Sequence, residues 1–219
     1  MLLLPGQKLT LWRRIYPAPD PMNPGKNRVS AGPGRMAPMT SPDAPSGTAT
    51  LADLEAMPGN DGNRYELIDG HIIVSPWPAH YGGVSFHLGP ILAHAVPPGH
   101  ASYRLCRLDL PGEQRVIPDL MVAPHTSVGD RGVNAPVLLI VEVLSGLSDE
   151  DMARKRAAYI AAEVPAYWLI DAEKPLATCM RLENGEYVTY AEGPAVEVDW
   201  PLAVSFDVAT VARPQGASS

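Results

Sequence analysis

The sequence between residues 117 and 159 decides how the chain is expected to fold and where its chemistry lies. It contains Ile117-Pro118-Asp119, then a polar loop, then the run Val137-Leu138-Leu139-Ile140-Val141-Glu142-Val143-Leu144, and then a short helix with Lys155. Asp119 and Glu142 are thus acids on otherwise apolar, strand-like segments. A buried carboxylate is costly unless it is paired or binds a metal. Two such acids followed by an inward-facing lysine therefore predict a divalent-metal site with a cation beside it.

The rest of the chain predicts short strands and helices around this stretch. The run from Val137 to Leu144 is apolar except for Glu142, as is typical of a strand covered on both faces. Pro118 interrupts the preceding strand, which indicates a bulge or an edge position that re-aims Asp119. The other predicted elements, in chain order, are a helix over 50–57, a hairpin over 64–74, an amphipathic helix over about 80–95, a hairpin over 103–122, a helix after Ser148, a strand over 167–171 and a hairpin over 177–190.

The helix after Ser148 carries Lys155 on its apolar face. Ser148 and the acids that follow it fit an N-cap and a first turn that is favourable to the helix dipole. Met152, Lys155, Tyr159 and Ala162 then recur at the spacing of one helical face. The alternative is a lysine whose stem lies along the boundary of the core while its amine reaches water.

Glu66 and three histidines are the other notable polar residues on predicted elements. Glu66 shares a strand face with Ile68, although the common role of such a glutamate is an edge-strand charge. The histidines lie at the start of the amphipathic helix or along it (His80, His87, His94). Their spacing matches no metal-binding motif, so packing or solvation is the simpler interpretation.

The composition indicates one ordinary globular domain preceded by a basic, proline-rich segment. Residues 1–47 hold nine of the 24 prolines and are expected to be a disordered tail, or to precede a true start at Met36 or Met39. We expect the ordered domain over residues 48–212 and a loose tail over 213–219. The first 47 residues carry six basic and two acidic residues, so the net charge of -7 leaves -11 on the remainder. An acidic domain counts against a nucleic-acid surface.

The sequence predicts a cytoplasmic protein with reduced thiols. No run reaches the roughly 18 apolar residues that a membrane span needs. The apolar residues at the start precede the basic pair Arg13-Arg14, which is the reverse of the order in a secretory signal. Cys106 and Cys179 form neither a zinc spacing nor a disulfide framework.

The residues of the central stretch suit Mg²⁺ chemistry. Mg²⁺ binds one or two carboxylates, a backbone carbonyl and several waters. Asp119, Glu142 and the carbonyl of Val143 can supply these ligands if their strands are adjacent, and Glu66 can complete the set from another strand. A bound metal lowers the pKa of a water and stabilises charge on a phosphoryl oxygen, while Lys155 can hold that water or the anionic transition state.

Several fragments, in their order along the chain, resemble those of a known family. They are Tyr65-Glu66-Leu67-Ile68-Asp69-Gly70, Pro118-Asp119-Leu120, Val141-Glu142-Val143-Leu144-Ser145, Lys155-Arg156-Ala157-Ala158-Tyr159 and Val164-Pro165-Ala166-Tyr167-Trp168-Leu169-Ile170-Asp171. Together they resemble the Uma-type restriction endonuclease family of the PD-(D/E)XK nuclease superfamily, over roughly residues 48–210. The resemblance implies an α/β fold with a restriction-endonuclease-like core, in which helices flank a central mixed sheet and an extra hairpin lies at each end.

The resemblance also implies cleavage of DNA phosphodiesters that depends on Mg²⁺, with Mn²⁺ as a substitute. By position, Asp119 matches the aspartate of the PD motif and Glu142 the acid of the (D/E)XK motif. Glu66 matches an upstream glutamate that serves as a metal ligand or as a partner of one. The lysine of the (D/E)XK motif falls at Leu144 in this chain, so the resemblance assigns its role to Lys155 in the next helix.

Two alternatives to a DNA endonuclease remain open. A binding or interaction protein that keeps the nuclease-like fold without catalysis fits the acidic domain and the displaced lysine. Nuclease chemistry on RNA fits the same residues. Analogy with the superfamily suggests a homodimer, because cutting both strands of DNA takes two sites. His80 stands where the family often has a histidine, and no role is assigned to it.

Overall fold

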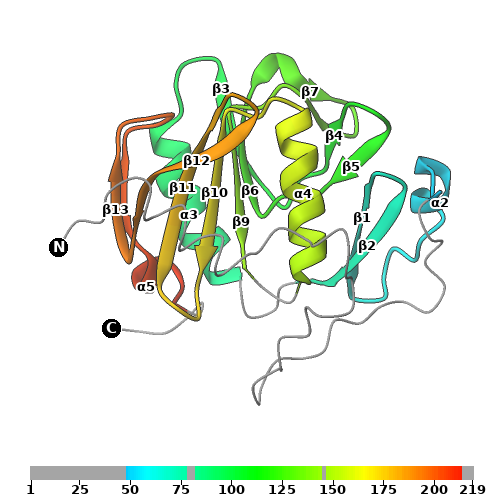
Figure 1. Ribbon diagram of the computed structural model, residues 1–219, viewed down its shortest axis with the longest axis horizontal. Helices are drawn as coiled ribbons and strands as arrows, with labels where there is room; N and C mark the ends of the chain where they lie inside the picture. Colours follow the sequence, from blue (N-terminus) through cyan, green and yellow to red (C-terminus); the bar gives the residue numbers. More distant parts are fainter. Residues whose placement is uncertain (1–47, 78–81, 145–146, 214–219) are drawn as a thin grey trace. The chain divides into compact units, whose positions relative to one another are not determined.

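The computed structural model describes residues 48–77, 82–144 and 147–213, which all belong to one compact unit of the chain, residues 38–219. Figure 1 shows the strands of this unit and its two longer helices, α3 (Gly82–Ala95) and α4 (Asp149–Ala161). The tails predicted over residues 1–47 and 213–219 lie outside the described residues, apart from Arg213. His80 also lies outside the described residues.

Six strands form a mixed sheet, here named the central sheet. Their order is β12-β11-β10-β9-β6-β3. The neighbours β9 and β10 are parallel, and the other neighbours are antiparallel. The strands span His100–Arg104 (β3), Leu120–Pro124 (β6), Leu139–Val143 (β9), Ala166–Asp171 (β10), Leu176–Glu183 (β11) and Glu186–Gly193 (β12). All five residues of β9 are buried, which confirms the prediction of a strand covered on both faces.

A second sheet of six strands lies next to α4, with the order β2-β1-β5-β4-β8-β7. Its strands span Asn63–Ile68 (β1), His71–Pro76 (β2), Leu108–Leu110 (β4), Gln114–Val116 (β5), Val128–Gly129 (β7) and Gly132–Asn134 (β8). A third sheet is the hairpin of β13 (Ala195–Val198) and β14 (Val204–Asp207). The fold is therefore of the predicted mixed α and β class.

The hairpin predicted over residues 103–122 divides between two sheets. Its outer parts, β3 and β6, pair in the central sheet, whereas β4 and β5 pair in the second sheet. Between β3 and β4, Leu105 has a φ of 48°, a left-handed conformation that ends the extended strand. On the other arm, Pro118 has no N–H for a strand ladder. The arms pair as a hairpin, as predicted, but the expectation that they lie in the middle of one sheet was wrong. The division places Asp119 where the chain passes between the sheets.

Helices cover both faces of the central sheet. On one face α3 packs together with α5 (Val208–Val211) and the β13–β14 hairpin, where Leu88 and Trp168 are fully buried. On the other face α4 packs against β9 and β10, and its Tyr159 is buried beside Ile140 of β9. Successive residues of a strand alternate between faces. Glu142, two residues after Ile140, therefore points toward α4.

The helix α4 begins as the sequence predicts. Ser148 is its N-cap, and the Ser148 side chain accepts the N–H of Asp151. Three acids occupy the first turn, which complements the positive end of the helix dipole. The buried residues of α4 are Lys155, Ala158 and Tyr159. The helix thus presents its lysine to the sheet, together with an alanine and a tyrosine.

Neither cysteine is a reactive thiol at neutral pH. Burial raises the pKa of Cys106 and raises that of Cys179 to about 12, so both stay thiols at neutral pH.

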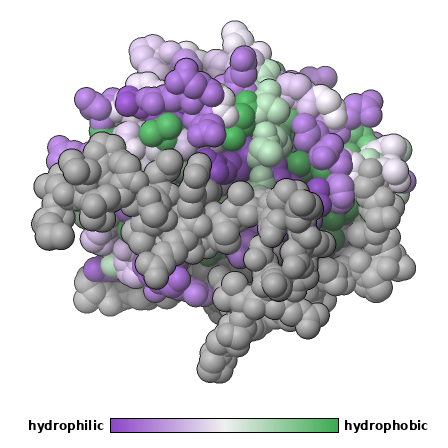
Figure 2. All heavy atoms as spheres, viewed as in Figure 1, coloured by the Kyte–Doolittle hydropathy of each residue, from purple (hydrophilic) through white to green (hydrophobic). Residues whose placement is uncertain are grey.

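In the face seen in Figure 2, hydrophilic residues predominate in the coloured part, with smaller hydrophobic areas between them. None of the helices in the described ranges combines the length and apolar character needed to cross a bilayer.

Candidate active site

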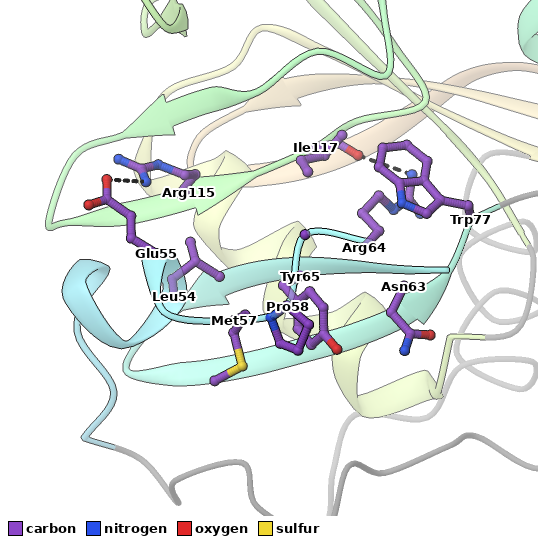
Figure 3. A pocket seen from close by; sticks show the side chains of 11 residues that line it. Leu54, Glu55, Met57, Pro58, Asn63, Arg64, Tyr65, Trp77, Arg115 and Ile117 are labelled. Atoms are coloured by element: carbon purple, nitrogen blue, oxygen red, sulfur yellow. Dashed lines mark hydrogen bonds and ion pairs between the residues drawn. The ribbon is translucent and has the colours of Figure 1, made fainter. Parts of the chain in front are cut away.

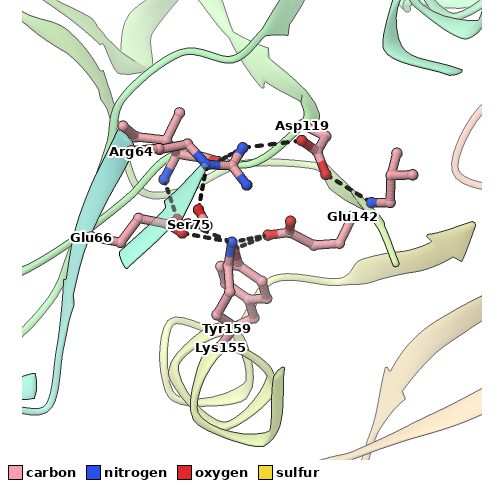
Figure 4. A network of polar contacts seen from close by, with 9 residues as sticks. Arg64, Glu66, Ser75, Asp119, Glu142, Lys155 and Tyr159 are labelled. Carbon is pink, nitrogen blue, oxygen red and sulfur yellow. Dashed lines mark hydrogen bonds and ion pairs between the residues drawn. The ribbon is translucent and has the colours of Figure 1, made fainter. Parts of the chain in front are cut away.

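Five ionisable side chains from four segments of the chain meet beside α4 (Figure 4). Arg64 and Glu66 come from β1, Asp119 from the residue before β6, Glu142 from β9 and Lys155 from α4. Each of them is at most 3% exposed. These five residues are named the polar cluster below. The structure thus brings together the four side chains predicted as the site and adds Arg64.

The amine of Lys155 joins two carboxylates. Its Nζ lies 2.8 Å from Oε1 of Glu142 and 3.0 Å from Oε1 of Glu66. Burial by itself lowers the pKa of a lysine, but the charges of Glu142 and Glu66 outweigh it and raise the pKa of Lys155. The complete burial of Lys155 excludes the alternative in which its amine reaches water. Glu66 is likewise buried and paired, so it is not a surface charge of an edge strand.

Arg64 holds Asp119 in place. Its Nη1 lies 3.0 Å from Oδ1 of Asp119, and it also donates to the carbonyl of Ile117 at 3.3 Å. Nε of Arg64 donates to the hydroxyl of Ser75 in β2 at 3.2 Å. The second oxygen of Asp119 accepts the N–H of Val143 at 2.8 Å. Both oxygens of Asp119 are therefore held by neighbours, one from each sheet.

Glu66 holds the chain at Ile117 from a second position. Its Oε1 accepts the N–H of Ile117 at 2.6 Å, while Arg64 bonds the carbonyl of that residue. The two side chains lie on one face of β1, two residues apart. They therefore bind both the N–H and the carbonyl of Ile117 to β1 through hydrogen bonds. This arrangement sets the direction in which the chain enters Asp119.

Asp119 and Glu142 lie opposite each other across paired strands. Leu120 in β6 pairs with Val141 in β9, so the next step along the ladder sets Asp119 against Glu142 on the α4 side. Like charges directly opposite each other destabilise a sheet. Arg64 on Asp119 and Lys155 on Glu142 offset this repulsion, which explains why two cations are buried here.

Glu142 is the acid whose proton affinity the site changes most clearly. Burial raises the pKa of Glu142 to about 7; Lys155 opposes this rise, whereas Asp119 and Glu66 add to it. Its Oε1 also accepts the hydroxyl of Tyr159 at 2.6 Å. Burial, followed by the charge of Glu142, raises the pKa of Tyr159, so its hydroxyl remains a donor. A carboxyl with a pKa near 7 can exchange a proton at neutral pH, as acid–base chemistry requires.

The carboxylates of the polar cluster are of the ligand type that Mg²⁺ prefers, but they are paired with the two cations of the cluster. Asp119 and Glu142 are a facing pair of carboxylates, which with waters is an ordinary Mg²⁺ ligand set. Over the ranges that the structure describes, no three acidic, histidine or cysteine side chains are grouped as ligands of one ion. Lys155 contacts both oxygens of Glu66, at 3.0 and 3.2 Å. The predicted roles of Asp119, Glu142, Glu66 and the Val143 carbonyl as ligands stay predictions.

Comparison with known proteins identifies the family. The Uma2 family, described as "Putative restriction endonuclease", matches residues 51–208, a range that contains the whole polar cluster. The chain belongs to the Uma2 family. Among solved structures, "a putative nuclease belonging to DUF820" from Anabaena variabilis superposes with a TM-score of 0.59 and 18% identity, over 74% of this chain and 97% of that one. This likeness shows a shared fold. No curated protein matches the chain.

Membership in Uma2 confirms the resemblance noted in the sequence and places the chain among restriction-endonuclease-like nucleases in general terms. A family of this kind points to a nucleic acid as the substrate. The polar cluster is the part of the described structure where such chemistry could be carried out. It combines facing carboxylates with a cation, and electrostatic stabilisation of a phosphate needs both kinds of group.

Sequence reasoning missed two partners in this candidate active site. Arg64 lies two residues before Glu66 on β1, and the period of a strand places both on one face. That spacing was a signal that could have found it. Ser75, which holds Arg64, lies opposite it in the hairpin of β1 and β2, so the register of the predicted hairpin was the signal for it.

Proposed function

We propose that this protein is a Mg²⁺-dependent endonuclease that hydrolyses phosphodiester bonds in DNA. The observation that carries the proposal is the position of the Lys155 amine, 2.8 Å from Oε1 of Glu142. Leu144 stands where the (D/E)XK motif has its lysine, and Lys155 reaches the acid of that motif from α4 instead. Two facing carboxylates and a lysine are therefore available on one side of the central sheet.

Each member of the polar cluster has a task in the proposed reaction. Asp119 and Glu142 would hold Mg²⁺, which when bound supplies a water of lowered pKa and stabilises charge on the phosphate. The ammonium of Lys155 can orient the attacking water and offset the negative charge that develops on the phosphoryl oxygens. Arg64 and Glu66 keep Asp119 and Lys155 at their positions through the contacts described above.

A second candidate is a nucleic-acid-binding protein that keeps the nuclease fold without catalysis. The observation that favours it is the balance of charge within the polar cluster, where Lys155 and Arg64 already pair with all three acids. The basic residues beside Lys155 do not form a positive surface that would offset the negative charge of the domain. Arg154 pairs with Glu150 at 2.6 Å, and Arg156 is partly buried against Tyr187. Loss of catalysis is thus the main competitor of the endonuclease.

Nicking of supercoiled plasmid separates these candidates. The full-length protein is incubated with plasmid in Mg²⁺, in Mn²⁺ and in EDTA, as wild type and as Asp119→Ala and Lys155→Ala. Asp199→Ala, an exposed aspartate beyond β13, is the control. We expect metal-dependent nicking by the wild type and the control alone. Equal nicking by all four would indicate a contaminant or another site, and binding without nicking would favour the second candidate.

Two further arms of this experiment address the substrate and the assembly. A labelled RNA replaces the plasmid to test cleavage of RNA, and faster loss of RNA than of DNA would move the proposal to that substrate. Direct conversion of plasmid to the linear form would support a homodimer, because both strands are then cut in one encounter.

A further inference from the structure

A pocket of about 220 Å³ opens beside the polar cluster (Figure 3). Its walls come from the end of α2 (Leu51–Glu55) and the turn after it, the start of β1, the residue after β2, and β5 with the residue that follows it. Arg64 belongs to both places, since it lines the pocket and also holds Asp119, and it bonds the carbonyl of Ile117, which lines the pocket too. A ligand in the pocket would therefore lie one side chain away from the candidate active site.

Trp77 is the residue of this pocket that indicates a ligand-binding site. It follows β2 directly, and 44% of it is exposed. Figure 3 shows it on the side of the pocket where Arg64 lies, with Leu54, Met57 and Pro58 along the remaining wall. A large aromatic residue exposed beside apolar walls is typical of a binding surface, because its flat ring gives much contact area at small entropic cost. The pocket thus offers one flat face and an apolar floor.

The charges around the pocket argue against a phosphate as its ligand. Both guanidinium groups that line it are already paired: Arg64 with Asp119, and Arg115 with Asp109 at 2.7 Å and Glu55 at 3.1 Å. Glu55 itself lines the pocket and adds a negative charge. Phosphate binding needs donors whose charge is not already offset by an acid. An uncharged planar group with polar edges fits better, since the Glu55 carboxylate can accept hydrogen bonds at such an edge.

We propose that this pocket binds one unpaired base of the nucleic-acid substrate, stacked on Trp77. The proposal rests on the proposed function for the nature of the substrate and adds its class: DNA in which a base next to the cleaved bond is unpaired. Bases inside a duplex are stacked on both faces and cannot enter a recessed pocket, whereas splayed bases stack on aromatic side chains. With the base on Trp77, the backbone beside it would pass Arg64 and Asp119.

Equilibrium binding of labelled DNA tests this proposal without cleavage. The full-length protein is titrated against a short fluorescent single strand and against the same strand in a duplex, in buffer with EDTA. The wild type should prefer the single strand. Trp77→Ala should weaken single-strand binding roughly 5- to 150-fold, the factor that corresponds to stacking of one base on an aromatic side chain. Trp77→Phe should keep most of the affinity, because a smaller aromatic ring remains.

A matched control comes from the other end of the domain. Trp200 is 38% exposed, follows β13 and does not line this pocket. Trp200→Ala should bind both DNA forms as the wild type does. Unfolding midpoints of the three variants show that each is folded at the temperature of the titration. A Trp77→Ala variant with unchanged affinity, or with equal losses for strand and duplex, would overturn the proposal.

The outcomes for the pocket and for the endonuclease are distinguishable. Trp77-dependent binding of single strands by a protein that never cuts supports the pocket and contradicts the endonuclease. Metal-dependent cutting of DNA that is unaffected by Trp77→Ala, with no preference for single strands, supports the endonuclease and overturns the pocket. A wild type that binds no nucleic acid overturns both.

Discussion

The ammonium of Lys155 lies 2.8 Å from Oε1 of Glu142, although α4 carries the first residue and β9 the second. A lysine two residues after Glu142 would share its strand and would be placed by local geometry alone. Here the pairing exists only once α4 has packed on the central sheet. The candidate active site is therefore a product of tertiary packing, and its stability and its chemistry should change together.

Removal of the Lys155 charge should destabilise the fold strongly. Lys155→Met keeps a similar length but leaves Glu66 and Glu142 buried without their cation. Breaking a buried ion pair at one partner costs about 3–5 kcal/mol, so the free energy of unfolding should fall by that order. Urea unfolding followed by circular dichroism measures it. Combining Lys155→Met with Glu66→Gln should restore part of the loss. If the double variant instead loses the sum of the two single-variant losses, the residues do not interact as described.

Stability should fall as the pH rises from about 4.5 to 7 because of Glu142. Burial raises the pKa of Glu142 from 4.5 to about 7, so the folded protein keeps a proton that the unfolded chain releases in this window. The stabilisation from this proton is complete below the lower value and is lost as the pH rises to the upper one. Lys155, whose pKa is raised from 10.5, loses its contribution only above that value.

Urea midpoints across this pH window test the assignment. The wild type should lose stability as the pH rises, and Glu142→Gln, which cannot ionise, should lack that part of the slope. All other ionisable groups are common to the two proteins, so a difference between their slopes belongs to Glu142. An identical slope in the two proteins would show that Glu142 has no raised pKa.

Tyr159→Phe should affect stability and activity, whereas Tyr187→Phe should affect stability alone. Each tyrosine hydroxyl makes one buried hydrogen bond, to Glu142 at 2.6 Å and to the carbonyl of Val164 at 2.8 Å. Loss of either bond should cost about 1–2 kcal/mol in thermal unfolding. The rate of plasmid nicking should fall only in Tyr159→Phe, because that hydroxyl fixes the Glu142 carboxylate. Equal rates in the two variants would remove Tyr159 from the site.

A lysine at position 144 should replace part of the function of Lys155. Leu144 lies two residues after Glu142 and packs against the core on the α4 side. In the proposed assignment it stands at the lysine position of the (D/E)XK motif. In the Lys155→Met background, Leu144→Lys should recover measurable Mg²⁺-dependent nicking. A folded double variant with no recovery would mean that the amine is needed specifically where α4 places it.

Local patterns predicted the elements of the fold and most residues of the candidate site, and their failures have physical causes. The apolar run of β9 and the helical face of Lys155 are periodic, so Glu142 and Lys155 could be found from residues 137–159. Arg64 becomes a partner of Asp119 only when the second sheet packs beside the central sheet, which no single segment encodes. The division of the hairpin at Leu105 and Pro118 likewise depends on competition between two sheets for the same strands.

The measurement that tests the central claim most directly is the nicking rate of a Lys155→Met/Glu66→Gln double variant in Mg²⁺. This variant removes one positive and one negative charge, so the net charge of the polar cluster is unchanged and the variant should be more stable than Lys155→Met alone. Its rate is compared with those of the wild type and of Lys174→Met, an exposed lysine in the turn after β10. The account predicts a loss of about 10²–10³-fold in the double variant and none in the control. A folded double variant that nicks DNA at the wild-type rate would contradict a catalytic role for Lys155.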